Sequence, residues 1–283
     1  MITQDISNSW VMDQGYFRNI DLPIKIKSAA ENEFFIVTED ALVEMFKSDK
    51  WEKTSTNSLS IIKEFKEKIL VTNPIGLLRE KELKSMKACH DFVDIQSTKL
   101  FRNLLDVYNT STISEIKEVL QEDISRTQAY KSNKVLNHEK NKDLYLSIVK
   151  QFQDQMGPTL RNDLRKNKVK LEDIYQIILD GIEECFRNPR GEFKDMSKNE
   201  LNCFIESKPV YYFLYTTLVF ESFYWQQKLG LEQINPQKVT NYILDTNYII
   251  IALYSKGILS NDRFMNEMYN HLKNIIEIKF GVE

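Results

Sequence analysis

The stretch YILDTNYIIIALYSKGILSNDRF, from Tyr242 to Phe264, predicts a helix, a short strand and a second helix in close succession. Asp245 lies within the apolar pattern of the first helix, and Gly257 ends that helix. Residues 258–260 follow as a buried strand, so Asp262 stands just past its carboxyl end. Because ligands of open α/β sheets bind at the carboxyl ends of the strands, Asp262 is a candidate site residue.

The first 76 residues alternate short apolar runs with amphipathic segments. The runs SNSWVMD (7–13), FFIV (34–37) and KILVTNP (68–74) have the length and composition of buried strands. The predicted helices between them begin at Pro23, after the N-cap Thr38 and at about residue 58. This alternation is typical of a parallel, doubly wound sheet, so an α/β fold class is predicted.

No convincing strand is found between the two strand-forming ends of the chain. Helical patterns cover about 78–108, 112–131, 136–156, 170–187, 196–206 and 209–229. The last of these contains the aromatic run PVYYFLYTTLVFESFYW, which we interpret as a buried helix because it is short for a bilayer span and contains Glu221. We therefore predict an α/β core from residues 1–76 and 236–283, with residues 77–235 as a large all-α insertion.

Composition restricts the classes of function. The net charge of −3 excludes a strongly basic coat for nucleic acid, so any such contact has to use local patches such as RNDLRKNKVK (161–170). Three cysteines without a CxxC pair suggest neither a disulfide framework nor a zinc site. The start of the sequence lacks the features of a signal peptide, and a cytoplasmic protein without a membrane association is expected.

Four acids stand at strand ends or in the adjoining helices: Asp13, Glu44, Asp245 and Asp262. Parallel strands end on one edge of a sheet, so these carboxylates are expected to converge there. Clustered carboxylates repel one another unless a cation neutralises them, and oxygen-only ligands suit Mg²⁺ or Mn²⁺. Asp40, Ser260 and Asn261 are predicted to support the site, with the latter two holding a water or a phosphate.

These motifs together resemble the PIN-domain ribonuclease family. The resemblance rests on WVMDQG (10–15), VTEDALVEM (37–45), LDTNYIIIAL (244–253) and ILSNDRF (258–264), under half of the chain. It implies a PIN-like parallel sheet and a metal-dependent endoribonuclease that cleaves single-stranded RNA, a family activity often found in toxins and defence effectors. The matching acids, which would bind Mg²⁺ or Mn²⁺ and act in catalysis, are Asp13, Glu44, Asp245 and Asp262.

The sequence departs from the family pattern and leaves alternatives open. Asp13 is followed by Gln14 and Gly15 in place of the family's Asp-x-Asn, and Asp21 and Asp40 compete for the first two acidic positions. Each acid also has a structural explanation, such as an N-cap at Asp262. A non-catalytic module that uses the helical region for a protein partner or a homodimer is the main alternative, and a DNA-directed nuclease is a further one.

Overall fold

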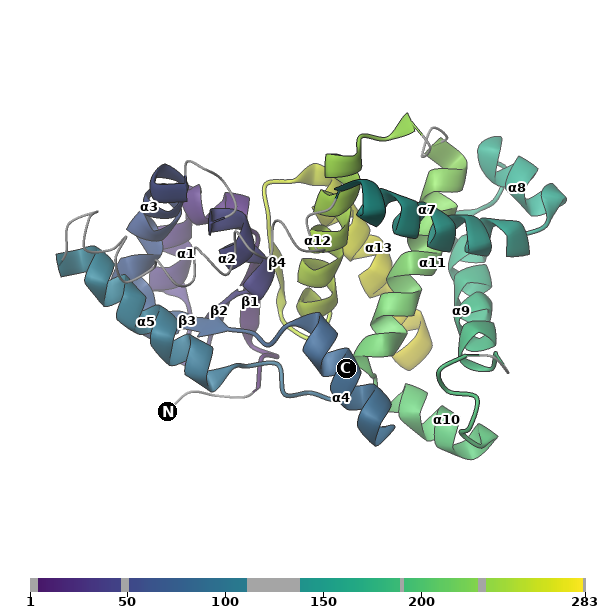
Figure 1. The fold of residues 1–283 in the computed structure, drawn as a ribbon, viewed down its shortest axis with the longest axis horizontal. Helices are drawn as coiled ribbons and strands as arrows, with labels where there is room; N and C mark the ends of the chain where they lie inside the picture. The colour runs from purple at the N-terminus through teal and green to yellow at the C-terminus, as the bar shows by residue number, and fades with distance from the viewer. Residues whose placement is uncertain (1–4, 47–50, 111–137, 189–190, 229–232, 282–283) are drawn as a thin grey trace. The chain divides into compact units, whose positions relative to one another are not determined.

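Four short strands form one parallel sheet in the order β3-β2-β1-β4 (Figure 1). The structure is a computed structural model, and it describes residues 5–46, 51–110, 138–188, 191–228 and 233–281. The strands are β1 (Ser9–Met12), β2 (Phe34–Val37), β3 (Ile69–Val71) and β4 (Gly257–Leu259). Each lies within or overlaps a predicted run, and the predicted α/β class with a parallel sheet is confirmed, while the PIN-like assignment stays a prediction.

Strand β1 joins the two ends of the chain. Val11 pairs with Ile36 of β2 on one side and with Ile258 of β4 on the other. All three side chains are buried, as expected for a parallel sheet that is covered on both faces. The strand order therefore reverses beside β1, since the chain proceeds from β1 to β2 and β3 in one direction and adds β4 in the other.

Helical segments surround the sheet. They are η1 (Gln14–Arg18), α1 (Leu22–Ser28), α2 (Glu39–Phe46), α3 (Trp51–Ile62), η2 (Lys63–Lys68) and α5 (Ile95–Thr110), of which η1 and η2 are 3₁₀ helices. Helix α2 begins as predicted, because the Thr38 hydroxyl accepts a hydrogen bond from the Ala41 amide at 3.2 Å.

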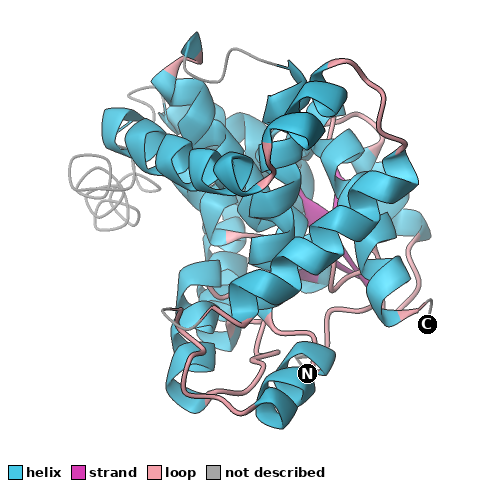
Figure 2. Ribbon diagram, turned by 90° about the vertical axis from the view of Figure 1, so that its right-hand side faces the viewer, coloured by secondary structure: helices cyan, strands magenta, loops and turns pink. Residues whose placement is uncertain are grey.

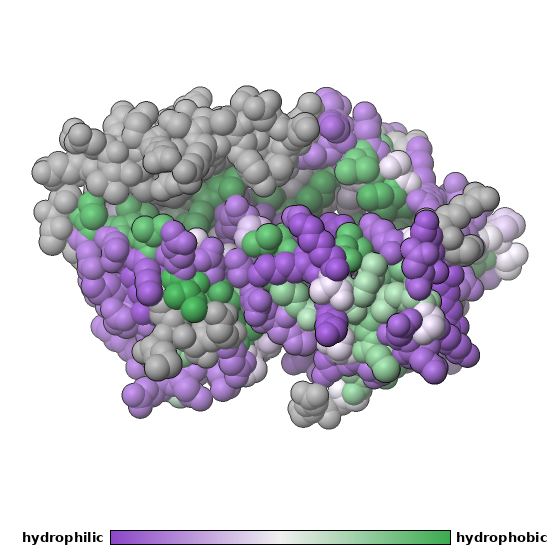
Figure 3. All heavy atoms as spheres, turned by 60° about the horizontal axis from the view of Figure 1, so that its bottom comes forward, coloured by the Kyte–Doolittle hydropathy of each residue, from purple (hydrophilic) through white to green (hydrophobic). Residues whose placement is uncertain are grey.

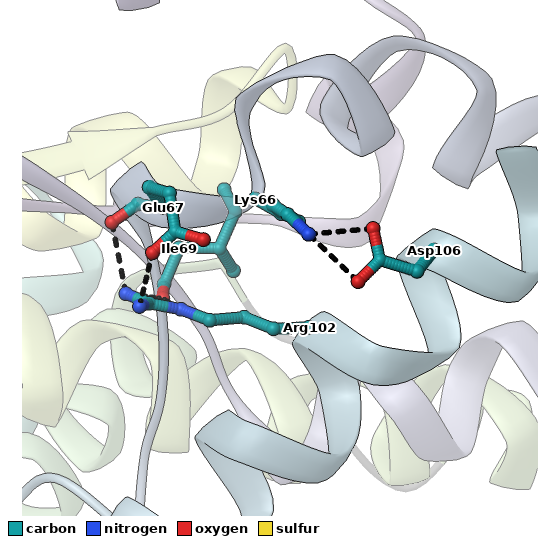
Figure 4. A network of polar contacts seen from close by, with 5 residues as sticks. All are labelled: Lys66, Glu67, Ile69, Arg102 and Asp106. Atoms are coloured by element: carbon teal, nitrogen blue, oxygen red, sulfur yellow. Dashed lines mark hydrogen bonds and ion pairs between the residues drawn. The ribbon is translucent and has the colours of Figure 1, made fainter.

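Helix α5 is fixed to η2 and to the edge strand β3 by a polar network (Figure 4). The Arg102 guanidinium donates to the carbonyl oxygens of Glu67 (2.8 Å) and Ile69 (2.9 Å), and Lys66 forms an ion pair with Asp106 at 2.6 Å. An edge strand leaves backbone groups unpaired, and the Ile69 carbonyl receives its hydrogen bonds from Arg102 instead of from another strand.

The predicted continuous helix at 78–108 is wrong. The chain forms α4 (Ile75–Ser85), then an extended segment, and then α5. Met86 has a positive φ of 51°, which ends α4, and Val93 pairs with Thr72 in an isolated antiparallel bridge. Apolar periodicity did not reveal this break because no Gly or Pro marks it. The helix predicted at 112–131 lies outside the described residues.

The chain divides into a sheet unit and a helical unit, which are each described separately. The sheet unit contains the described residues up to Leu78, those from Asp91 to Thr110, and Asn247–Tyr269. The helical unit contains Arg79–His90, the described residues from His138 to Thr246, and those from Asn270 onward. These divisions cut through α4, α12 (Pro236–Ala252) and α13 (Arg263–Phe280), whereas the predicted boundaries at residues 76 and 236 lay near the ends of helices.

The helical unit is built around α11 (Val210–Lys228), the predicted aromatic helix. It packs against α7 (His138–Gln155), α8 (Pro158–Arg165) and α9 (Leu171–Phe186), while α10 (Lys198–Glu206) precedes it in the chain. Tyr211, Tyr212 and Phe213 are buried, and so is Glu221. None of the helices among the described residues has the length and apolar character that crossing a membrane requires.

Helix dominates the described chain, as the colouring of Figure 2 shows. The short polar helix α8 was not predicted, because it follows Gly157 at Pro158 and has few apolar residues.

On the face drawn in Figure 3, hydrophilic side chains are interspersed with small hydrophobic groups. Several large apolar side chains of the described residues remain exposed, among them Ile20 (85%) and Ile24 (68%).

Candidate acidic site at the carboxyl edge of the sheet

Asp13 follows β1 directly and lies where the strand order reverses. Its amide donates to the Leu259 carbonyl at 3.0 Å, which continues the β1–β4 pairing by one residue. Its carboxylate accepts hydrogen bonds from the Gly15 amide (3.3 Å) and the Ser260 hydroxyl (2.9 Å). A reversal of strand order beside the carboxyl ends of parallel strands is the usual position of a ligand site in open α/β sheets.

The surroundings of Asp13 disfavour its charge. Burial raises the pKa of this carboxyl, the hydrogen bonds from Ser260 and Gly15 lower it, and the nearby carboxylates of Glu44 and Asp262 raise it again. The net direction is upward. Three of the four predicted site acids therefore lie close enough to interact electrostatically.

Gly15 leaves space for the Asp13 carboxylate. A Cβ atom at position 15 would stand 3.2 Å from Asp13 Oδ2. The neighbouring Gln14 points elsewhere, since its amide donates to the Ser58 hydroxyl at 3.0 Å. Position 15 therefore supplies no amide side chain beside Asp13, in contrast to the Asn of the Asp-x-Asn motif in the family that the sequence resembles.

Glu44 and Asp40 reach the same edge from α2, which follows β2. The Glu44 carboxylate accepts a hydrogen bond from the Tyr248 hydroxyl at 2.9 Å. Asp40 accepts one from the Asn247 amide at 3.2 Å. The Asp40 residue keeps a partly exposed surface, but its carboxyl group is enclosed, and this burial, together with Glu39 and Glu44, raises its pKa to about 7.

Tyr248 interacts with three of these acids, Glu44, Asp40 and Asp13. Its side chain is fully buried, and its pKa is raised well above 10, first by burial and then by the carboxylates of Glu44, Asp40 and Asp13. The hydroxyl consequently remains a proton donor at all ordinary pH values. Tyr248 and Asn247 were not predicted as site residues, although an Asn-Tyr pair before an otherwise apolar IIIA run was a visible signal.

Asp262 has the capping role that the sequence suggested for a residue after β4, and its role as a site acid stays a prediction. Its Oδ1 accepts a hydrogen bond from the Met265 amide at 3.0 Å, so it is the N-cap of α13. Its own amide donates to the Ser260 hydroxyl at 2.9 Å, and that hydroxyl donates to Asp13. Ser260 therefore links the two acids, and its predicted role of holding a water or a phosphate stays a prediction. The Asn261 side chain instead accepts a hydrogen bond from Asn19 at 2.9 Å.

Asp245, the fourth predicted acid, belongs to the helical unit, whereas Asp13, Glu44 and Asp262 belong to the sheet unit. It lies half-buried on α12, in the part of that helix that belongs to the helical unit. Asn247 and Tyr248, in the part of α12 that belongs to the sheet unit, contact Asp40 and Glu44. Its role as a fourth ligand stays a prediction.

The donor set of the sheet edge consists of oxygen atoms, which is the chemistry that Mg²⁺ and Mn²⁺ prefer. Among the described residues, no group of three or more His, Cys, Asp or Glu side chains stands close enough together to hold a metal ion. The acids are instead held individually by neutral hydroxyl and amide donors. The cluster therefore has suitable ligand types, and a tridentate site would need its side chains to move closer together.

Comparisons with known proteins do not assign a family. Neither the protein-family models, nor the curated proteins, nor the solved structures include a match to this chain.

Proposed function

We propose that this protein is a divalent-metal-dependent endoribonuclease of PIN-like fold that hydrolyses phosphodiester bonds of single-stranded RNA. The observation that carries the proposal is the interaction of Asp13 with both Glu44 and Asp262 beside the reversal of strand order. Carboxylates that repel one another at a ligand-binding edge are typical of cation sites.

In this proposal Asp13, Glu44 and Asp262 hold the cation, with Asp40 beside them and Asp245 as a predicted further ligand. When bound, Mg²⁺ or Mn²⁺ would activate a water molecule and offset the charge that develops on the phosphate. Ser260 orients Asp13, and Tyr248 orients Glu44, through the hydrogen bonds described above. Such donors fix the direction of a ligand oxygen, as outer partners do in known metal sites.

In this proposal, the protonation of Asp40 makes the affinity for the cation depend on pH. With a pKa of about 7 its carboxyl is partly protonated at neutral pH, and a bound cation would favour the ionised form. Metal binding should therefore release protons near pH 7, and the affinity should rise with pH until Asp40 is ionised in the free protein.

The test is Mn²⁺ calorimetry together with cleavage of a labelled single-stranded RNA. Asp13→Asn and Asp262→Asn remove one charge each, and Asn at position 262 retains an N-cap. Asp195→Asn is the control, because this exposed acid lies in the helical unit. We expect both site variants to lose Mn²⁺ binding and cleavage while the control retains them. Equal background cleavage by wild type and both site variants would refute the enzymatic function.

A non-catalytic module is the second candidate. Two observations favour it. Neutral donors already form hydrogen bonds with the acids, and the group beside Asp40 is the Asn247 amide, whereas a carboxylate there would add negative charge for binding a cation. Such a protein would use its helical unit for a protein partner. Absence of Mn²⁺ binding at millimolar concentration, with folding intact by circular dichroism, would support this candidate over the nuclease.

A further inference from the structure

A pocket of about 650 Å³ lies within the helical unit, and all of its lining residues belong to that unit. Helices α7 and α11 pack against each other (Figure 1). Each contributes one stripe of residues to the pocket lining. The stripes are Ile148, Gln151, Phe152 and Gln155 on α7, and Tyr211, Leu214, Tyr215 and Leu218 on α11. Each follows the i, i+3, i+4, i+7 spacing of a single helix face, so the pocket is a regular product of the two helices.

The apolar wall of the pocket is incompletely covered by protein. Phe152, Leu214 and Leu218 line it and are half-buried, whereas Val149 and Val219 on the adjoining faces of the same helices are fully buried or nearly so. Helix faces of this spacing normally bury their apolar residues against a neighbour. Here they border open volume that is within the usual size range of small-molecule sites, roughly 300–1,000 Å³.

The polar part of the lining is a chain of hydrogen-bonded groups, which includes Tyr211 and Tyr215 of the same α11 stripe. Arg79 Nη2 donates to the Tyr211 hydroxyl at 3.3 Å, and that hydroxyl donates to Glu192 at 3.4 Å. The Tyr215 hydroxyl donates to the other oxygen of Glu192 at 3.2 Å. The guanidinium of Arg79 also lies over the Tyr211 ring, 4.8 Å from its centre. This network joins a cation, two phenol rings and a carboxylate of the pocket lining.

Arg79 has unused hydrogen-bonding capacity. Its Nε is shielded from solvent and has no hydrogen-bond acceptor. A buried donor without a partner carries a free-energy cost, and a charged donor prefers an anionic acceptor. A ligand oxyanion that draws the guanidinium toward the pocket would supply that acceptor. Arg187, a second guanidinium on the lining, already pairs with Glu183 at 3.1 Å.

We propose that this pocket binds a nucleoside monophosphate. The phosphate would pair with Arg79, the base would lie on the apolar wall beside the Tyr215 ring, and Glu192 would accept hydrogen bonds from the ribose hydroxyls. A simple inorganic anion is too small for the volume and would meet the carboxylates of Glu192 and Glu184 without compensation. A fatty acid would leave the polar groups of the lining without hydrogen-bond partners on the ligand. The proposal goes beyond the nuclease function and does not depend on it.

Calorimetric titration of the full chain with AMP, adenosine and inorganic phosphate tests this inference. The titrations contain a chelator and no divalent ion, so that the result is independent of the sheet-edge site. Arg79→Gln removes the cation, and Leu214→Trp fills the pocket. Lys84→Gln is the matched control, because it removes a positive charge from the same helix at an exposed ion pair. Thermal melting of each variant monitors folding.

We expect one AMP to bind per chain, with adenosine and inorganic phosphate each bound at least tenfold more weakly. Arg79→Gln should weaken AMP binding by about tenfold to a hundredfold, as loss of a charged hydrogen bond does. Leu214→Trp should abolish binding, and Lys84→Gln should leave it unchanged. Lack of AMP binding at millimolar concentration, equal binding of adenosine, equal binding of phosphate, or wild-type affinity in the Leu214→Trp protein would each overturn the proposal.

Discussion

Glu82 provides a direct test of how the helical unit is held together. This fully buried carboxylate on α4 accepts backbone hydrogen bonds from Val210 (2.8 Å) and Tyr211 (3.0 Å), the first two residues of α11, and from Cys89 (3.0 Å). The first N–H groups of a helix have no partner within the helix, and a negative charge also complements the helix dipole. Glu82 is therefore a cap that comes from a distant part of the chain.

The substitution Glu82→Gln replaces one acceptor oxygen by an amide donor with little change of shape. Either the bond to Tyr211 or the two bonds to Val210 and Cys89 must then be lost, because an NH₂ group cannot accept them. Hydrogen bonds to charged groups contribute about 1.5–3 kcal/mol each, so the free energy of unfolding should fall by about 2–3 kcal/mol. For a chain of this size that loss lowers the melting temperature by roughly 4–12 °C.

The assay is urea unfolding followed by circular dichroism, with hydrogen exchange at the Val210 and Tyr211 amides as a local measurement. Glu80→Gln is the control, because Glu80 stands on the same helix in an exposed ion pair with Lys84. We expect Glu82→Gln to lower the midpoint and to speed exchange at both amides, with Glu80→Gln close to wild type. Indistinguishable midpoints and exchange rates in the two variants would refute the capping role.

Three further predictions follow from buried or crowded positions. Burial raises the pKa of Glu221 from 4.5 to about 7, so this group should cost up to about 3 kcal/mol of stability as the pH rises from 4.5 to 7, and Glu221→Gln should flatten the dependence of the urea midpoint between pH 5 and pH 8. Gly257→Ala should destabilise by about 1–3 kcal/mol, since its Cβ would lie 2.9 Å from an indole carbon, whereas Gly181→Ala, whose Cβ meets nothing nearer than 4.0 Å inside α9, should stabilise by up to about 1 kcal/mol; thermal melting decides both. Burial raises the pKa of Cys185 to about 11, so mass spectrometry after brief alkylation at pH 8 should find the exposed Cys203 labelled and Cys185 unlabelled.

The sheet could be predicted from the sequence because its strands are short apolar runs with clear boundaries. Parallel pairing then placed Asp13, Glu44 and Asp262 near one edge without knowledge of the connecting segments. The α12 contacts could not be resolved in the same way. Asn247 and Tyr248 meet Asp40 and Glu44 through one face of α12, and which face meets the acids depends on how α12 packs, which is a tertiary property.

Other features were hidden because they depend on contacts between distant residues. The end of α4 at Met86 has no Gly or Pro to mark it. Glu82 occupies an ordinary position in a charged helix, and only the structure shows that it caps α11. The pocket of the helical unit combines Arg79 with residues more than a hundred positions later in the chain, such as Tyr211, so periodicity along a single segment could not reveal it.

Several carboxylates in this chain are buried, but their surroundings give them different meanings. Glu82 and Glu221 each accept hydrogen bonds from neutral donors and have no other carboxylate among the main causes of their shifted pKa values. Hydrogen-bond donors or a bound proton are enough to stabilise such a carboxyl group in its buried position. Asp13 and Asp40 also have neutral donors, yet each is raised further by other carboxylates, and both are affected by Glu44. Hydroxyl and amide donors cannot remove repulsion between acids, whereas one divalent cation removes it for all of them at once. The repulsion at the sheet edge is therefore the reason to look for a ligand there and to treat the isolated buried acids as structural.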